Sequence, residues 1–143
     1  MARSDDLERV VVTGMGTLNP LGNNVESFWD ALISGQSGVS RMTLIDPSGY
    51  ECQIAGEIKD FDYSKYMDKK VGRRIARFSQ IAVGASRMAL EQAGLETSQM
   101  DESSRQRFGV LVGNGGGAID EDQRSMETIY SKGPGRVDPF YIS

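Results

Sequence analysis

The strongest constraint on the fold comes from two short valine-rich runs that each end in a glycine-rich turn. The first is Val10–Val12, which continues into Gly14 and Gly16. The second is Phe108–Val112, which continues into the sequence GNGGGA at 113–118. Short β-branched runs bounded by turn residues are typical of strands buried on both faces of a parallel sheet. Together with helices between and after them, they predict an α/β fold that binds its ligands at the ends of these strands.

The longest periodic segment is Asp68–Ala93, and its spacing predicts a single amphipathic helix ended by Gly94. One face of this helix carries small side chains. Gly84 lowers the stability of a helix by about 1 kcal/mol relative to alanine, a loss that is tolerable if another backbone packs closely there. The small residues of that face are Ala82, Ala85 and Ala89. The other expected elements are a helix over Val25–Ser34 capped by Asn23 or Asn24 and ended by Gly35, a short edge strand within Cys52–Ile58, and a helix over Ile119–Tyr130.

Composition excludes several classes of protein. The chain has 143 residues, 38% of them hydrophobic and 25% charged, which suits one ordinary globular domain. Its net charge of −4 argues against general affinity for nucleic acid. No apolar run approaches the roughly 20 residues that span a bilayer, and the start lacks the pattern of a signal peptide. We therefore expect a cytoplasmic protein that binds neither nucleic acid nor membrane.

The sequence contains no histidine and one cysteine, Cys52. The absence of histidine excludes Ser-His-Asp and Cys-His catalysis within these residues, and every zinc site that uses histidine. No metal site is expected. Nothing near Cys52 would activate its thiol as a nucleophile, so we interpret it as a buried or half-buried structural cysteine.

The second glycine-rich turn also fits a dinucleotide-binding pattern. Gly113–Ala118 matches G-x-G-x-x-A between an expected strand and an expected helix. The full fingerprint needs a further strand ending in an acidic residue about 20 residues later. That region is Lys132–Arg136, with the sequence KGPGR, which cannot form a buried strand. We therefore expect no cofactor, and interpret the glycines as positions where the backbone turns tightly beside a neighbouring segment.

A cluster of basic side chains is the clearest binding signal in the residues themselves. It consists of Lys69, Lys70, Arg73, Arg74 and Arg77, with no acidic residue among them. Four of them follow i, i+3, i+4, i+7 spacing from Lys70, which would place them on one helical face. Like charges repel there, and cations near a helix N-terminus oppose the helix dipole. This local cost predicts that the face binds an anionic partner, either an acidic protein or a phosphate group.

Four stretches resemble one known family. They are VVVTGMGTLNPLGNNVESFWDALISGQSGV at 10–39, KKVGRRIARFSQIAVGASRMALEQAGL at 69–95, FGVLVGNGGG at 108–117 and GPGRVDPFYIS at 133–143. The resemblance is to the β-ketoacyl-[acyl-carrier-protein] synthases, most of all to the type II, chain-elongating enzymes. It implies a thiolase-like fold with αβαβα layers. Residues 1–143 would form the incomplete N-terminal part of this domain, its first βαβ portion.

The resemblance also implies a reaction and site residues. The family joins an acyl thioester to malonyl-carrier protein by a decarboxylating Claisen condensation in fatty-acid or polyketide synthesis, usually as a homodimer. Its nucleophilic cysteine and two catalytic histidines lie beyond the position of Ser143, so no catalytic residue is assigned in this chain, Cys52 included. Lys70, Arg73 and Arg74 match positions that contact the acyl carrier protein. Gly116 matches a gate to the acyl pocket that is bulky in some members.

Two hypotheses follow from the sequence. The first is an N-terminal portion of a condensing enzyme, inactive alone. The second is a non-catalytic carrier-binding module, or a subunit that completes its site with another chain. The gene sequence downstream discriminates between them. With Val10–Val12 and Val110–Val112 left as a two-stranded parallel pair, we expect the isolated chain to be loosely packed or to aggregate.

Overall fold

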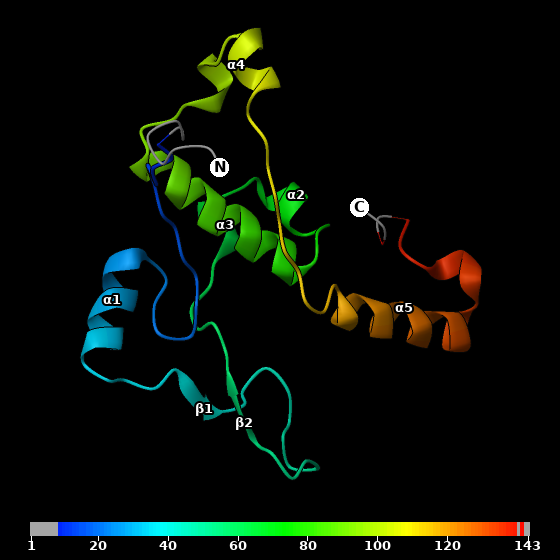
Figure 1. Ribbon diagram of the computed structural model, residues 1–143. Coiled ribbons are helices and arrows are strands. Elements are labelled where there is room, and N and C mark those ends of the chain that lie inside the picture. Colours follow the sequence, from blue (N-terminus) through cyan, green and yellow to red (C-terminus); the bar gives the residue numbers. More distant parts are fainter. Residues whose placement is uncertain (1–8, 140, 142–143) are drawn as a thin grey trace, which may run out of the picture.

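The computed structural model describes residues 9–139 and 141. Its α-helices are α1 (Val25–Ile33), α2 (Lys69–Gly72), α3 (Arg77–Gln92), α4 (Glu102–Gln106) and α5 (Ile119–Lys132). Its strands are β1 (Val39–Arg41) and β2 (Ile54–Gly56), and its 3-10 helices are η2 (Tyr63–Lys65), η3 (Thr97–Gln99) and η4 (Pro134–Arg136). Helix α3 lies in the middle, with α1 and the strands on one side of it and α5 extending away on another (Figure 1).

Helix α1 forms as its local sequence predicts. The side-chain oxygen of Asn24 accepts a hydrogen bond of 2.8 Å from the amide of Ser27, which satisfies an otherwise unpaired N–H of the first turn. The helix ends one residue before the expected boundary, and Gly35 follows with φ +69°. Helix α5 also agrees with expectation, starting at Ile119 and extending two residues beyond Tyr130.

The single helix expected over Asp68–Ala93 is wrong: the structure divides it into α2 and α3. Four residues, 73–76, separate the two, and Ala76 is extended with ψ 154°. The break follows Gly72, a poor helix former, which is buried against the ring of Tyr63. The side chain of Gln80 also donates to the carbonyl of Gly72 at 2.7 Å, so this carbonyl has a partner without a continuing helix.

The small-residue face of α3 packs against the first glycine turn, a contact that the sequence did not predict. A Cβ on Gly14 would overlap the carbonyl oxygen of Ala89, and one on Gly16 would overlap that of Ala85. The first turn therefore lies directly on the backbone of α3, where only glycine fits. Gly84, on the same helix, is buried instead beneath side chains, those of Leu18 and Tyr66.

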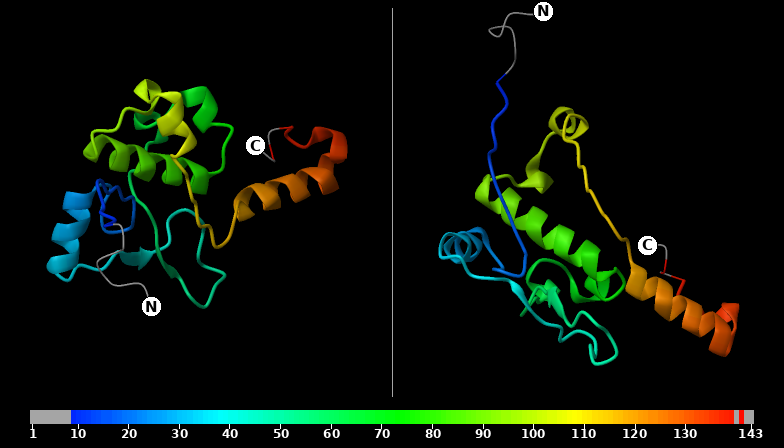
Figure 2. Two further views of the ribbon diagram at one scale, coloured as in Figure 1. Left: turned by 45° about the horizontal axis from the view of Figure 1, so that its top comes forward. Right: turned by 60° about the horizontal axis from the view of Figure 1, so that its bottom comes forward.

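The two valine-rich runs do not form the parallel pair expected from the sequence. Among the described residues, the only sheet is the antiparallel pair β1–β2, in which Ser40 faces Ala55. Strand β2 lies within Cys52–Ile58 as expected, whereas no sequence pattern predicts β1. The two runs are extended, lie on different sides of α3 (Figure 2), and leave Val10 91% and Leu111 99% exposed. Strands buried on both faces need covering layers on each side, and these residues supply only α3.

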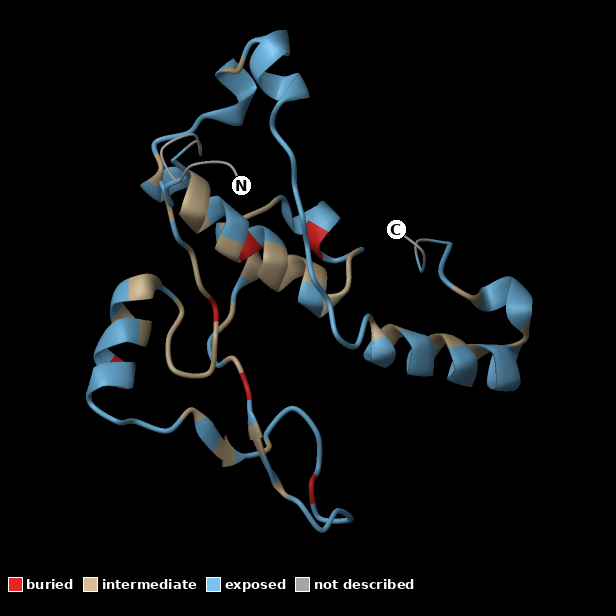
Figure 3. Cartoon of the chain, in the orientation of Figure 1, coloured by how far each residue is buried: buried red, intermediate tan, exposed pale blue. Residues whose placement is uncertain are grey.

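Burial is sparse, and the buried residues are scattered singly over the helices, the first glycine turn and the segments around the strands (Figure 3). If glycine and proline are set aside, Leu18 and Ala31 are the only apolar residues that are buried in the described part of the chain. Cys52, expected to be buried or half-buried, is exposed, because the loop that carries it projects beyond the β1–β2 pair. No helix in the described part of the chain has both the length and the apolar character to cross a membrane.

One carboxylate organises the loop between the strands. Glu57 is 9% exposed, and both of its oxygens accept hydrogen bonds from the amide of Thr43 at 2.9 and 3.0 Å. The Thr43 hydroxyl donates at 2.7 Å and the Leu44 amide at 3.0 Å. The Leu44 amide and the Thr43 hydroxyl hold the pKa of Glu57 below its ordinary value, because they stabilise the charged form.

Candidate functional site

The basic cluster lies at the junction of α2 and α3. Lys69 and Lys70 are exposed on α2. Arg73 and Arg74, which are also exposed, come directly after this helix ends at Gly72. The Nε of Arg73 donates to the carbonyl of Lys69 at 3.3 Å. The amide of Arg74 donates to the carbonyl of Val71 at 2.9 Å. The three residues matched to carrier-protein contacts, Lys70, Arg73 and Arg74, are thus presented together at one exposed bend.

Helix α2 is only four residues long, so tertiary contacts must hold it in place. Asp68 caps its N-terminus, accepting hydrogen bonds from the amides of Lys70 at 2.7 Å and Val71 at 3.3 Å. Gly72 sits flat against Tyr63, where a Cβ would overlap the aromatic ring. The exposed cations are therefore carried on a short element that is fixed at both ends.

Arg77 does not share this surface, so the expectation of one basic face from Lys70 to Arg77 is wrong. Its guanidinium lies 5.4 Å from the ring centroid of Phe61 and donates to the carbonyl of Ile58 at 3.0 Å. The i+7 argument assumed a continuous helix, and the break after Gly72 rotates α3 relative to α2. Arg77 consequently fastens the start of α3 to the segment after β2.

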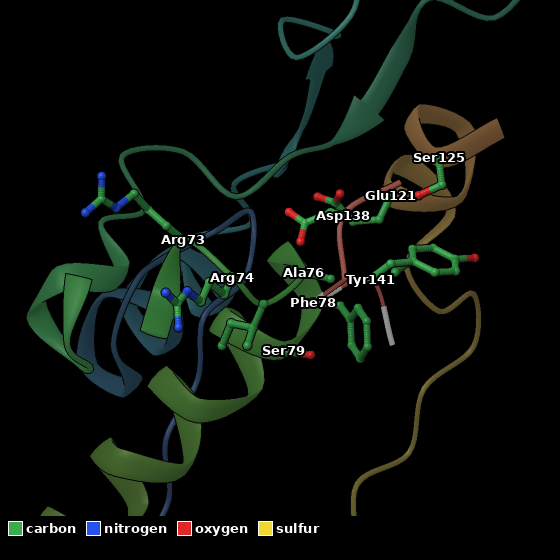
Figure 4. Close-up of a pocket in the computed structure, with 11 residues that line it drawn as sticks. Arg73, Arg74, Ala76, Phe78, Ser79, Glu121, Ser125, Asp138 and Tyr141 are labelled. Carbon is green, nitrogen blue, oxygen red and sulfur yellow. The ribbon is translucent and has the colours of Figure 1, made fainter. Parts of the chain in front are cut away.

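A hollow of about 260 Å³ lies between the α2–α3 bend and the C-terminal elements (Figure 4). Arg73 and Arg74 are on the bend side of this hollow, and Glu121 and Asp138 on the opposite side. The other side chains that line it include Phe78, Ser79, Ser125 and Tyr141. The hollow is therefore polar, with opposite charges on its two walls.

A neighbouring hollow of about 670 Å³ shares Arg73 and adds two arginines that the sequence reasoning missed, Arg124 and Arg136. Arg124 is paired with Glu121 at 2.7 Å and approaches Asp120 at 3.9 Å. Arg136 is exposed on η4. These arginines lie some 50 and 60 positions after Arg73 in the chain, so no local periodicity could relate them to the cluster.

The second glycine turn is open. A Cβ on Gly113 or Gly115 would have nothing within 4 Å, and one on Gly116 would meet only Ile119 at 3.5 Å. The side-chain oxygen of Asn114 accepts hydrogen bonds from the amides of Gly116 at 3.1 Å and Gly117 at 3.0 Å. The expectation that these glycines lie tightly beside a neighbouring segment is therefore wrong for this turn.

The structure brings this open turn next to the basic bend. Ala118, two residues after Gly116, lines the same hollow as Arg73 and Arg74. On the same side, the hydroxyl of Tyr141 donates to the carboxylate of Asp122 at 2.5 Å. That hydrogen bond raises the pKa of Tyr141, because it stabilises the protonated phenol beside a negative charge. Residues 9–139 and 141 contain no group of three or more Cys, Asp or Glu side chains placed to hold a metal ion.

The sequence comparisons match nearly the whole chain to one family. A profile described as beta-ketoacyl synthase, N-terminal domain, matches residues 7–141. A 3-oxoacyl-[acyl-carrier-protein] synthase 2 from Vibrio harveyi is 42% identical over 134 residues, and one from Staphylococcus aureus (strain COL) is 38% identical over 135. Each alignment covers 94% of this chain and 32% of the relative. The chain thus spans about a third of the length of these relatives.

Solved structures give the same result for the fold. A beta-ketoacyl synthase from Burkholderia phymatum superposes with a TM-score of 0.73 at 29% identity, over 94% of this chain and 33% of that one. The ishigamide ketosynthase/chain length factor gives 0.74 at 28% identity, over 92% and 32%. A type II polyketide ketosynthase in complex with its acyl-carrier protein gives 0.68 at 24% identity, over 92% and 33%. The thiolase-like fold class is confirmed for the chain, which forms part of it.

Proposed function

This chain belongs to the family of the beta-ketoacyl synthase N-terminal domain, and from that membership we propose that it forms the N-terminal third of a 3-oxoacyl-[acyl-carrier-protein] synthase. Its reaction would be the decarboxylating condensation of an acyl thioester with malonyl-carrier protein, in fatty-acid or polyketide synthesis. The complete protein would be a cytoplasmic homodimer. The identity to synthases in Vibrio harveyi and Staphylococcus aureus supports this assignment.

In this reaction a cysteine thiolate takes the acyl group from the carrier protein. Malonyl-carrier protein then loses CO₂, and the resulting carbanion attacks the acyl thioester, with developing negative charge stabilised by the protein. The 143 residues contain no histidine, and Cys52 lies on an exposed loop. The chain would therefore supply binding surfaces, and residues outside it would supply the reacting groups.

The exposed bend with Lys70, Arg73 and Arg74 carries the proposal for the partner. From Lys69 to Leu90 the sequence holds six cations and no carboxylate, within a protein whose net charge is −4. Such a local positive surface favours an acidic partner by electrostatic steering and complementarity. We assign that partner as the acyl carrier protein. A ketosynthase of the same fold in complex with its own carrier protein offers a precedent at the level of fold.

Gly116 is proposed as the gate position of the acyl pocket. It lies in the open turn, where a Cβ would meet only Ile119 at 3.5 Å, two residues before Ala118, which lines the hollow beside the basic bend. A glycine leaves this position unobstructed, whereas a side chain there would project into the space.

The second candidate function is a non-catalytic module that binds the carrier protein. The observation that favours it is the absence of histidine from a chain that presents an exposed basic surface. The gene sequence beyond Ser143 separates the two candidates. A frame that continues into a cysteine and two histidines supports the synthase, and a stop codon there supports the module.

The docking proposal is tested by charge reversal in the protein that the gene encodes. We expect Lys70→Glu, Arg73→Glu and Arg74→Glu to weaken binding of fluorophore-labelled acyl carrier protein, and the loss to shrink as salt rises, because exposed charges are screened over about 8–10 Å at physiological ionic strength. Arg87→Glu, an exposed arginine near the middle of α3, is the matched control. Equal affinities for all variants at low salt would contradict the proposal.

A further inference from the structure

Gln80 occupies an unusual place beneath the basic bend. Its side-chain nitrogen donates hydrogen bonds to the carbonyls of Gly72 at 2.7 Å and Ile75 at 3.3 Å. These two carbonyls flank Arg73 and Arg74 in the sequence. One half-buried amide group therefore holds the backbone on both sides of the two arginines.

The same residue separates the two helices. In a continuous α-helix the carbonyl of Gly72 would accept from the amide of Ala76, but here it accepts from the side chain of Gln80. The backbone amide of Gln80 meanwhile donates to the carbonyl of Ala76 at 3.1 Å, in the first turn of α3. The backbone amide of Gln80 thus makes a hydrogen bond of the first turn of α3, and its side chain caps the last carbonyl of α2.

Nearby contacts leave the bend few alternatives. Gly72 is buried against Tyr63, so α2 cannot rotate toward η2. Arg77 is fastened to Ile58, which fixes the start of α3 on the other side. Between these two anchors, the amides of Arg73 and Arg74 donate to Lys69 and Val71, and Gln80 holds the carbonyls on either side of the two arginines.

We propose that Gln80 is a positioning residue for carrier-protein docking: its amide sets the α2–α3 bend and thereby directs Arg73 and Arg74 toward the acidic partner. This inference rests on the proposed docking function. Its physical basis is preorganisation, because a bend already held in the binding geometry loses less conformational entropy when the partner binds. Gln80 itself need not touch the partner, being only partly exposed.

The test replaces Gln80 by methionine, which keeps the unbranched shape and removes the donor. In the protein that the gene encodes, we expect Gln80→Met to raise the dissociation constant for labelled acyl carrier protein about 3- to 10-fold at low salt, the range that corresponds to one net hydrogen bond. Gln106→Met, on the exposed helix α4, is the matched control and should change affinity less than about 1.5-fold. Should Gln80→Met lower the urea midpoint, Gln80→Leu, which also lacks the donor and adds no charge, takes its place.

A double-mutant cycle distinguishes positioning from a general structural role. If Gln80 acts through the arginines, Gln80→Met should have little effect on binding in an Arg73→Ala/Arg74→Ala background. An equal loss in both backgrounds, or no loss beside the native arginines, would overturn the inference while leaving the docking function intact. If Arg73→Ala/Arg74→Ala binds as well as the native protein, the docking function itself fails and the inference falls with it.

Discussion

The two glycine-rich turns look alike in sequence and differ completely in their surroundings. Gly14 and Gly16 lie on the backbone of α3, where any Cβ would overlap a carbonyl oxygen. A Cβ on Gly113 or Gly115 would have no neighbour within 4 Å, and their turn is held by the side chain of Asn114. Glycine is thus a packing requirement in the first turn and leaves open space in the second.

This difference extends to the regions around the turns. The first turn belongs to a region that contains the buried residues Leu18 and Gly84 and the enclosed carboxylate of Glu57. The second connects an extended run, in which Leu111 is 99% exposed, to a helix α5 without a buried residue. The two regions meet at the hollow lined by Arg73 and Arg74 on one side and by Glu121 and Asp138 on the other.

The largest expected effect concerns the chain taken alone. With Val10 91% and Leu111 99% exposed, residues 9–139 and 141 bury too little apolar surface to offset the conformational entropy of folding. We expect helical far-UV circular dichroism, no cooperative thermal transition and a tendency to aggregate. A sharp, reversible transition with dispersed amide NMR signals would contradict this, and would favour the independent carrier-binding module.

The next prediction breaks the first turn and spares the second. In the gene-encoded protein, Gly16→Ala should lower the free energy of unfolding by about 3 kcal/mol or more, because the new methyl group overlaps Ala85 and α3 must shift. Gly115→Ala, with open space around it, should change stability by less than about 0.5 kcal/mol. Urea unfolding measures both, and similar losses for the two variants would remove the contrast between the turns.

The third prediction concerns acyl-chain selectivity at the open turn. Gly116→Ile should reduce kcat/KM for long acyl chains about 5- to 100-fold more than for short ones, as expected when a side chain overfills a pocket. Gly117, with φ +65°, is the comparison, since alanine there should strain the backbone and affect all chain lengths equally. Equal losses across chain lengths for Gly116→Ile would assign it a backbone role instead.

The smallest expected effect is a pH dependence in the region of the first turn. The folded state lowers the pKa of Glu57, so its charged form contributes stability that is present above the unfolded pKa of about 4.3 and lost as pH falls through the folded value. Glu57→Gln should therefore flatten the loss of unfolding free energy between about pH 5 and pH 3. Identical slopes for the two proteins would show that this carboxylate does not drive the acid response.

Local sequence was sufficient for features that depend on neighbours in the chain. Asn24 and Gly35 bound α1, the predicted start of α5 at Ile119 agrees with the structure, and the family resemblance rests on motifs in order along the chain. The positions Lys70, Arg73 and Arg74 could also be named as a group, because they lie within five consecutive residues. Caps, helical periods and short motifs act over a few residues, so they can be predicted without a fold.

Only the tertiary structure decided where the helix predicted over Asp68–Ala93 breaks into α2 and α3, and what each glycine faces. The break depends on the ring of Tyr63 and the amide of Gln80, and the direction of Arg77 depends on Ile58, 19 positions earlier. Strand pairing is decided in the same way. A run such as Val10–Val12 has the composition of a strand, but its backbone groups and side chains need partners from distant segments before a sheet can form.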